Sequence, residues 1–180
     1  MTLHLAAAAA YRPEPQVPQA RRPHASPDAF RSAMRQIPAA VTVVTTAVHG
    51  IRHGLTATAV VPVSAEPPQV LVCVDAHSRS SRSIRRAGRF AVNYLTGEHT
   101  AIAEAFAAPA GDPEDRFRHG TWNQTPSGTP LLTDAAAALE CTVVTQIRSG
   151  THVLFIGEAR HVRWHEDKTL VYKRRTFGQF

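Results

Sequence analysis

The residues best suited to chemistry in this sequence are Ser78, Arg79 and Ser80, which place two hydroxyls around a guanidinium. They lie between an apolar run at 69–75 and the stretch SRSSRSIRRAG at 78–88, for which we predict a strand and a short helix that Gly88 caps. Hydroxyls, a guanidinium and the N–H groups of a helix N-terminus suit a phosphate. The segment 54–95 therefore predicts a phosphate-bearing cofactor held on a β scaffold. The alternative is a Ser-rich helix cap beside a solvated arginine.

The surrounding sequence predicts a mainly β fold with short flanking helices. Helical spacing of apolar residues predicts one helix from Asp28 that ends at Pro38 and another at 99–109. A long polar loop is expected at 110–130. Pro62 lies inside one predicted strand and implies an edge or a bulge. Strands are predicted at 40–50, 54–64, 69–75, 89–95 and 139–147, in a hairpin partner at 151–165 and in one short strand of the tail. Six or seven strands without a βαβ rhythm favour an antiparallel barrel with helices packed outside.

Composition limits the choice of function without deciding it. The 180 residues are 43% hydrophobic, enough for one domain with a core. A formal net charge of +6 favours anionic ligands, but the sequence has no zinc-finger, helix-turn-helix or RNP signature for nucleic acid. It also has no GxGxxG or GxxxxGK[ST] motif and no Ser/His/Asp or metal-ligand pattern. These observations disfavour Rossmann and P-loop sites.

The N-terminal part and the cysteines suggest where the protein resides. Residues 1–27 are rich in Pro and Arg, so we expect a disordered or loosely docked arm before a domain at 28–180. The sequence shows no transmembrane run, and no basic region precedes its short apolar start, which argues against a secretory signal. Cys73 and Cys141 lie in apolar strand-like runs and are expected to be reduced and buried. We therefore expect a cytoplasmic protein without a metal site or membrane attachment.

Several motifs from Phe30 to Phe180 together resemble the short-chain flavin reductases, which have an FMN-binding split-barrel fold (a Greek-key antiparallel barrel). The motifs occur in the family's order: FRSAMRQIPAAVTVVTT, GLTATAVVPVSAEPP, VLVCVDAHSRSS, IRRAGRFAVNYL, AEAFA, DRF with Trp122, LECTVV, GTHVLFIGE and LVYKRRTF. The resemblance implies reduction of free FMN or FAD by NADH or NADPH. It also implies a homodimer that supplies reduced flavin by diffusion to a partner monooxygenase or halogenase.

The resemblance also implies roles for individual residues. The strand that lines the flavin ring would contribute Thr58, Ala59, Val60, Pro62 and Ser64, although Thr and Val are common in any strand. The ribityl and phosphate loop would contribute Asp75, Ser78, Arg79 and Ser80. The arginines that follow, Arg82, Arg85, Arg86 and Arg89, are expected on a solvated face.

Further residues would lie near the covering loop and the nicotinamide. Phe106 and Ala107 resemble the loop over the flavin, although core packing explains Phe106 equally well. His152 would be the catalytic residue, near the nicotinamide or the flavin edge, or else a hairpin-turn histidine without a role. Thr151 stands where the family commonly has Asp. The C-terminal segment would bring Tyr172, Arg175 and Phe177 to the nicotinamide.

The residues leave several alternatives open. They do not choose between FMN and FAD or between NADH and NADPH. A flavin-binding protein without reductase activity, such as a sensor or carrier, is the first rival. A basic nucleic-acid-binding module is the second, disfavoured because the arginines are scattered and no exposed aromatics are interleaved with them.

Overall fold

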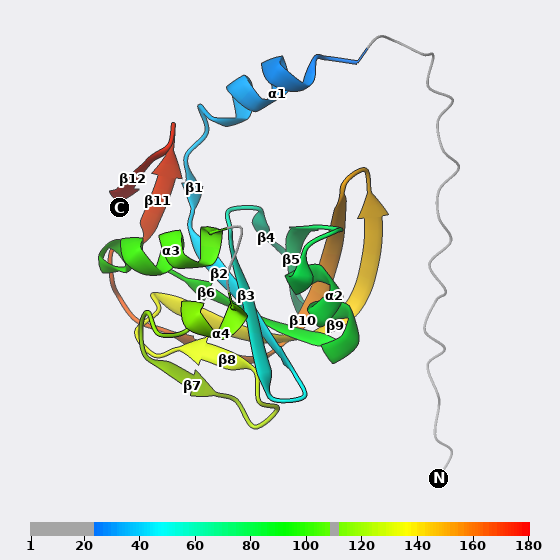
Figure 1. The fold of residues 1–180 in the computed structure, drawn as a ribbon, viewed down its shortest axis with the longest axis vertical. Helices are drawn as coiled ribbons and strands as arrows, with labels where there is room; N and C mark the ends of the chain where they lie inside the picture. The colour runs from blue at the N-terminus through cyan, green and yellow to red at the C-terminus, as the bar shows by residue number, and fades with distance from the viewer. Residues whose placement is uncertain (1–23, 109–111) are drawn as a thin grey trace.

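The computed structural model describes residues 24–108 and 112–180, and Figure 1 shows their arrangement. Helix α1 (Pro27–Met34) begins at Ser26, whose side chain accepts a hydrogen bond from the Ala29 amide. It ends at Met34, one turn before the predicted end at Pro38. No residue of α1 is buried, and the helix stands apart from the sheet in Figure 1. Its apolar spacing therefore does not reflect packing on this chain's own core. Most of the predicted N-terminal arm, residues 1–23, lies outside the described residues.

A seven-stranded antiparallel sheet forms the body of the fold, in the order β3-β2-β6-β9-β10-β5-β4. Its strands are β2 (Thr42–Val48), β3 (Ile51–Ala57), β4 (Val60–Ala65), β5 (Pro68–Asp75), β6 (Arg89–Tyr94), β9 (Ala137–Ser149) and β10 (His152–Trp164). The edges β3 and β4 follow each other in the chain, yet no ladder joins them in the described part. The mainly β, antiparallel fold is confirmed, and the barrel is open along this line.

The break between β3 and β4 corrects one prediction. A single strand was expected over 54–64, but the strand pairing stops at Ala57 and resumes at Val60. There the chain leaves β2 and crosses to β5, where the Cys73 amide donates to the Ala59 carbonyl at 3.0 Å. Pro62 lies on an edge strand beside a register shift, as predicted.

Smaller elements cover the open barrel. Two further sheets pair β1 (Ala39–Ala40), β11 (Leu170–Lys173) and β12 (Thr176–Gln179), and β7 (Trp122–Gln124) with β8 (Pro130–Leu132). The tail thus holds two strands, not the one predicted, and the predicted polar loop contains helix α4 (Pro113–Arg116) and β7. The remaining helices are α2 (Arg79–Ala87), the 3₁₀ turn η1 (Gly97–His99) and α3 (Thr100–Ala107). Gly88 ends α2 in a left-handed conformation, as predicted.

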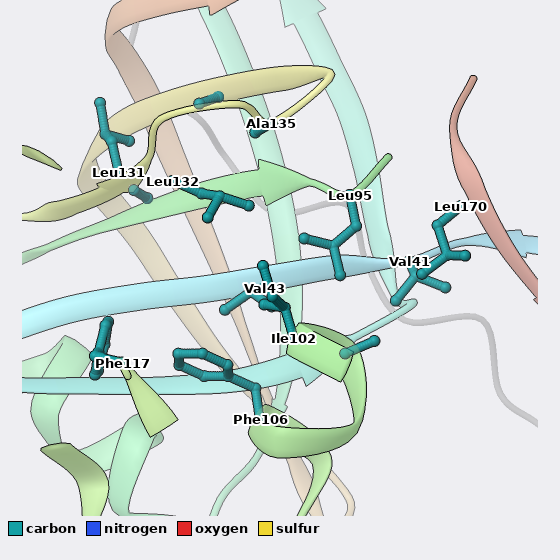
Figure 2. Close-up of a cluster of buried hydrophobic side chains, with 13 residues drawn as sticks. Val41, Val43, Leu95, Ile102, Phe106, Phe117, Leu131, Leu132, Ala135 and Leu170 are labelled. Carbon is teal, nitrogen blue, oxygen red and sulfur yellow. The ribbon is translucent and has the colours of Figure 1, made fainter. Parts of the chain in front are cut away.

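Two groups of buried side chains form the core, one on each side of β2. Figure 2 shows Ile102 and Phe106 projecting from α3 toward the strand that carries Val43. The second group gathers Val44, Phe90 and Phe155 with Cys141. Burial of Cys141 raises the pKa of its thiol to about 12, with the nearby Glu140 adding to the shift, so this thiol is protonated and unreactive.

Three findings bear on the predictions about the surface. Cys73 is a free thiol like Cys141, but it is only half-buried because it lies on the partly open face of β5, so its predicted burial is wrong. Within 24–108 and 112–180, no helix is long and apolar enough to cross a membrane. The same residues contain no cluster of His, Cys, Asp or Glu that could hold a metal ion.

Candidate functional site

A cavity of about 730 Å³ lies where β3, the N-terminus of α2, helices α3 and α4, and the β11–β12 hairpin meet. Binding sites for small molecules are usually about 300–1,000 Å³, so the cavity is large enough for a nucleotide-sized ligand. Its described lining comprises Val41, His53, Gly54, Leu55, Thr56, Thr58, His77, Ser78, Arg79, Ser80, Arg82, Ala103, Phe106, Ala107, Ala108, Pro113, Arg116, Tyr172 and Phe177. This lining contains histidines and arginines but no Asp or Glu. The cavity therefore favours an anionic ligand.

The structure brings together eight of the predicted site residues around this cavity. They are Thr58, Ser78, Arg79, Ser80, Phe106, Ala107, Tyr172 and Phe177. They come from segments as far apart as Thr58, which follows β3, and Phe177 in β12, and the sequence order alone does not place these together. Arg175 instead lines a neighbouring groove of about 440 Å³ beneath α1, which shares Thr58 and Tyr172 with the cavity.

The other predicted residues do not line the cavity. Ala59, Val60, Pro62 and Ser64 belong to β4 and the residue before it, on the far side of the strand break. Asp75 and His152 face each other across the β5–β10 ladder, and both are exposed. The Thr151 hydroxyl lies 2.8 Å from Nδ1 of His152, so Thr151 takes the place of the missing carboxylate beside the imidazole.

The serines at the N-terminus of α2 form hydrogen bonds with the backbone of this chain. The Ser78 hydroxyl donates to the Asp75 carbonyl at 2.8 Å and accepts from the Ser81 amide at 3.0 Å, which caps the helix. The Ser80 hydroxyl donates to the Gly54 carbonyl of β3 at 3.2 Å. A hydroxyl has one proton to donate. Both side chains are therefore engaged with the backbone, and in this arrangement their hydroxyl protons do not point to a ligand.

Aromatic residues build the apolar wall of the cavity. Phe106 lines it and packs edge-on against Phe117, with ring centroids 5.0 Å apart, and against Trp122 at 5.4 Å. Gly54 permits this wall, because a Cβ at that position would lie 2.5 Å from the Phe106 ring. Phe106 thus serves both predicted roles, since it is buried in the core and lines the cavity.

Helix α4 closes one side of the cavity through an ion pair that the sequence did not reveal. The Glu114 carboxylate accepts from the Arg52 amide at 2.7 Å, from its Nε at 2.8 Å and from its Nη2 at 2.6 Å. The guanidinium of Arg52 also lies over the Phe117 ring, 4.5 Å from its centroid. Hydrogen bonding to Arg52 holds the pKa of Glu114 below its ordinary value. These contacts tie α4 to β3 at the cavity.

Sequence reasoning also missed His53 and Arg116, and it did not foresee that Arg82 lines the cavity. Burial lowers the pKa of His53, and the nearby Arg79 adds to this, while Glu114 opposes it. Arg82 is exposed, as expected, and it also lines the cavity, where its Nη1 donates to the His77 carbonyl at 2.7 Å. The basic residue in the sequence DRF was the only signal for Arg116, and it gave no indication of the contact to β3.

Comparisons with known proteins show the family of this chain. The flavin reductase like domain matches residues 34–180. The chain belongs to this family. It is 40% identical over 131 residues, 72% of this chain and 73% of the other, to the reductase component of an FADH(2)-dependent resorcinol hydroxylase from Rhizobium sp.. It is 37% identical to a 4-hydroxyphenylacetate 3-monooxygenase reductase component of Salmonella typhimurium over 82% of this chain and 88% of that one.

A solved structure extends the likeness to three dimensions. The NADH:FAD oxidoreductase SgcE6 of Streptomyces globisporus, in complex with NAD and FAD fragments, superimposes with a TM-score of 0.78 at 30% identity. The match covers 84% of this chain and 90% of that chain. The family and the split-barrel fold inferred from the sequence are thereby confirmed.

Proposed function

We propose that this protein is an NAD(P)H:flavin oxidoreductase that reduces FMN or FAD and supplies the reduced flavin to a partner monooxygenase or halogenase. The observation that carries the proposal is the cavity itself, with an apolar aromatic wall and a basic end, in a chain that belongs to the flavin reductase family. Relatives named as reductase components of monooxygenases support the supply role.

The residues present fit a flavin. Phe106, Ala103 and Leu55 provide apolar surface for a flat ring, and Arg79, Arg82 and Arg116 provide positive charge for a phosphorylated tail. When bound, flavin supplies the N5 atom that accepts a hydride from the nicotinamide carbon. The protein's part is to hold the two rings in contact and to exclude water.

The proposal assigns the nicotinamide to the end of the cavity near the β11–β12 hairpin, which carries Tyr172 and Phe177. Tyr172 and Phe177 lie with ring centroids 5.1 Å apart where the cavity meets the groove beneath α1, which suits a second flat ring entering from that side. Arg175 lines that groove and would face the charged part of the dinucleotide. The catalytic role of His152 remains a prediction, because in this single chain the residue is exposed and does not line the cavity.

The proposal includes a homodimer in the cytoplasm. Apolar side chains are exposed on β4 (Val61 and Val63) and on β9 (Val144 and Ile147). A second copy of the chain would cover such side chains. Both described cysteines are free, as in a reducing compartment.

The test is NADH or NADPH oxidation by the purified protein with and without added FMN, FAD or riboflavin. Rapid oxidation that requires an added flavin supports the proposal and identifies both specificities. Flavin that stays bound and is not reduced by either nicotinamide would instead favour the sensor or carrier. Steeply salt-dependent binding to DNA or RNA without flavin binding would favour the nucleic-acid module.

A further inference from the structure

The side chain of Arg116 reaches from α4 to a carbonyl of β3 that a residue of α2 also contacts. Its Nη1 donates to the Gly54 carbonyl at 3.1 Å, and the Ser80 hydroxyl donates to the same oxygen at 3.2 Å. Its Nη2 donates to the Ala108 carbonyl at 2.6 Å. The guanidinium is thus fixed beside the end of the cavity that Ser78, Arg79 and Ser80 form.

The charge of Arg116 has no carboxylate partner within the described part of the chain. Its partners there are backbone carbonyls, and its Nε is buried without any hydrogen bond. A guanidinium has five N–H groups, and the bonds to Gly54 and Ala108 use two of them. A buried donor without a partner is destabilising. Nε of Arg89 and of Arg163 is also buried without a hydrogen bond, so what distinguishes Arg116 is its place in the cavity lining.

A neighbouring arginine shows the ordinary arrangement. Arg118 is exposed, pairs with Asp115 at 3.0 Å and does not line the cavity. On the same short segment, one arginine is therefore neutralised at the surface and the other is held at the cavity without a counter-ion. Because the serine hydroxyls at this end already donate to carbonyls, an anion would be attracted mainly by the arginine guanidiniums, which are the permanently charged groups of the described lining.

We propose that Arg116 is a specificity-determining residue that binds the phosphate of the flavin and so distinguishes FMN and FAD from riboflavin. The inference rests on the proposed function for the identity of the ligand. The phosphate lies between α2 and α4, with Arg79 and Arg82 on one side and Arg116 on the other. Riboflavin, which has the same ring but no phosphate, does not use this contact.

The experiment is a flavin-fluorescence titration of FMN and riboflavin with the wild-type protein, Arg116→Gln and the control Arg118→Gln. Binding is measured without nicotinamide, so the result does not depend on turnover. In Arg116→Gln the Kd for FMN should rise about 10- to 100-fold, with riboflavin within about threefold of wild type. Arg118→Gln should match the wild type for both ligands.

The outcomes separate the two proposals. An equal loss for FMN and riboflavin, or no loss, overturns the role of Arg116. Wild-type protein that binds FMN but does not oxidise a nicotinamide overturns only the reductase activity, and wild-type protein that binds neither flavin overturns both. Should Arg116→Gln fail to fold, Arg116→Lys, which keeps the charge without the fork, should show a smaller selective loss for FMN. Equal losses in that variant likewise overturn the role.

Discussion

Two polar regions of this molecule use their hydrogen-bonding groups in opposite ways. Glu140 on β9 is buried, and its carboxylate accepts from Thr125 at 2.7 Å and from Ser127, with the imidazole of His161 3.7 Å away. Its Oε1 thus accepts from two hydroxyls of the β7–β8 turn, and the neighbour of its Oε2 is His161 of β10. At the cavity, Arg116 carries a charge that only carbonyls contact. The comparison separates a buried charge that hydroxyls of the same chain stabilise from a partly buried charge at a cavity that, in our proposal, a ligand completes.

The largest expected effect is the loss of stability when the buried carboxylate of Glu140 is removed. Glu140→Ala removes the carboxylate that accepts from the Thr125 and Ser127 hydroxyls, which then keep only each other and Thr129 as partners, so the free energy of unfolding should fall by about 2–4 kcal/mol. Urea unfolding measures the change, and exposed Glu104→Ala on α3 is the control. Folded Glu140→Ala should bind FMN as the wild type does, since Glu140 does not line the cavity. A large loss of FMN affinity would contradict this separation of roles.

The next effect tests the aromatic wall of the cavity, which Phe106 forms. In Gly54→Ala the added Cβ would lie 2.5 Å from the ring of Phe106, which is itself packed against Phe117. Overpacking should lower the free energy of unfolding by about 1–3 kcal/mol. Displacement of Phe106 should also weaken the binding of FMN and of riboflavin by the same factor, because both ligands have the same ring. Gly50→Ala at the β2–β3 turn would be strained by its φ of 81° without contacting the cavity, so it should change stability alone. Unchanged flavin affinity in Gly54→Ala would contradict this prediction, because it would show that Phe106 accommodates the added Cβ without disturbing the cavity.

Gly54 also shows where sequence reasoning reached and where it stopped. The strand, the Ser/Arg cluster and the helix that form one end of the cavity are local features, so patterns of polarity and turn residues predict them. The contact of Gly54 with Phe106 and Arg116 joins residues far apart in the chain. No local pattern encodes such a contact, and Arg116 therefore resembled any other arginine of a polar loop.

The prediction of one continuous strand over 54–64 was wrong for a different reason, because the strand breaks at Thr58–Ala59. Its residues have a continuous strand-like pattern, and β-branched residues on both sides give no local signal for the switch of partner from β2 to β5. Helix α1 shows a third case. Its spacing of Phe30 and Met34 correctly predicted a helix, but both side chains are exposed on the single chain, so the pattern did not predict burial.

A pH titration sharpens the comparison on the acidic side. Burial alone would raise the pKa of Glu140, but hydrogen bonds from Ser127, Thr125 and Thr129 outweigh it and hold the pKa below its ordinary value of 4.5. The stabilisation is therefore present above the unfolded value and is lost as the pH falls through the lowered folded value. The difference in unfolding free energy between wild type and Glu140→Gln should be largest near pH 7 and shrink below about pH 4. A difference that is constant over this range would show that the charge of Glu140 contributes nothing.

The smallest effect concerns the basic side. Burial lowers the pKa of His53 below 6.5, so this cavity-lining imidazole is neutral at pH 7 and gains a positive charge only in more acidic solution. That charge would add to Arg79 and be partly offset by Glu114. As the pH falls below 6, FMN affinity of the wild type should rise about two- to threefold relative to His53→Gln. Riboflavin should show no such difference.

The FMN phosphate itself gains a proton near pH 6, so the two proteins are compared at each pH and not across the pH range. Exposed His165→Gln serves as the control because it lies outside the cavity. If FMN affinity of wild type and His53→Gln changes in parallel from pH 7 to about pH 5, the added charge at His53 does not reach the phosphate. The proposed phosphate site would then consist of Arg79, Arg82 and Arg116 without a contribution from His53.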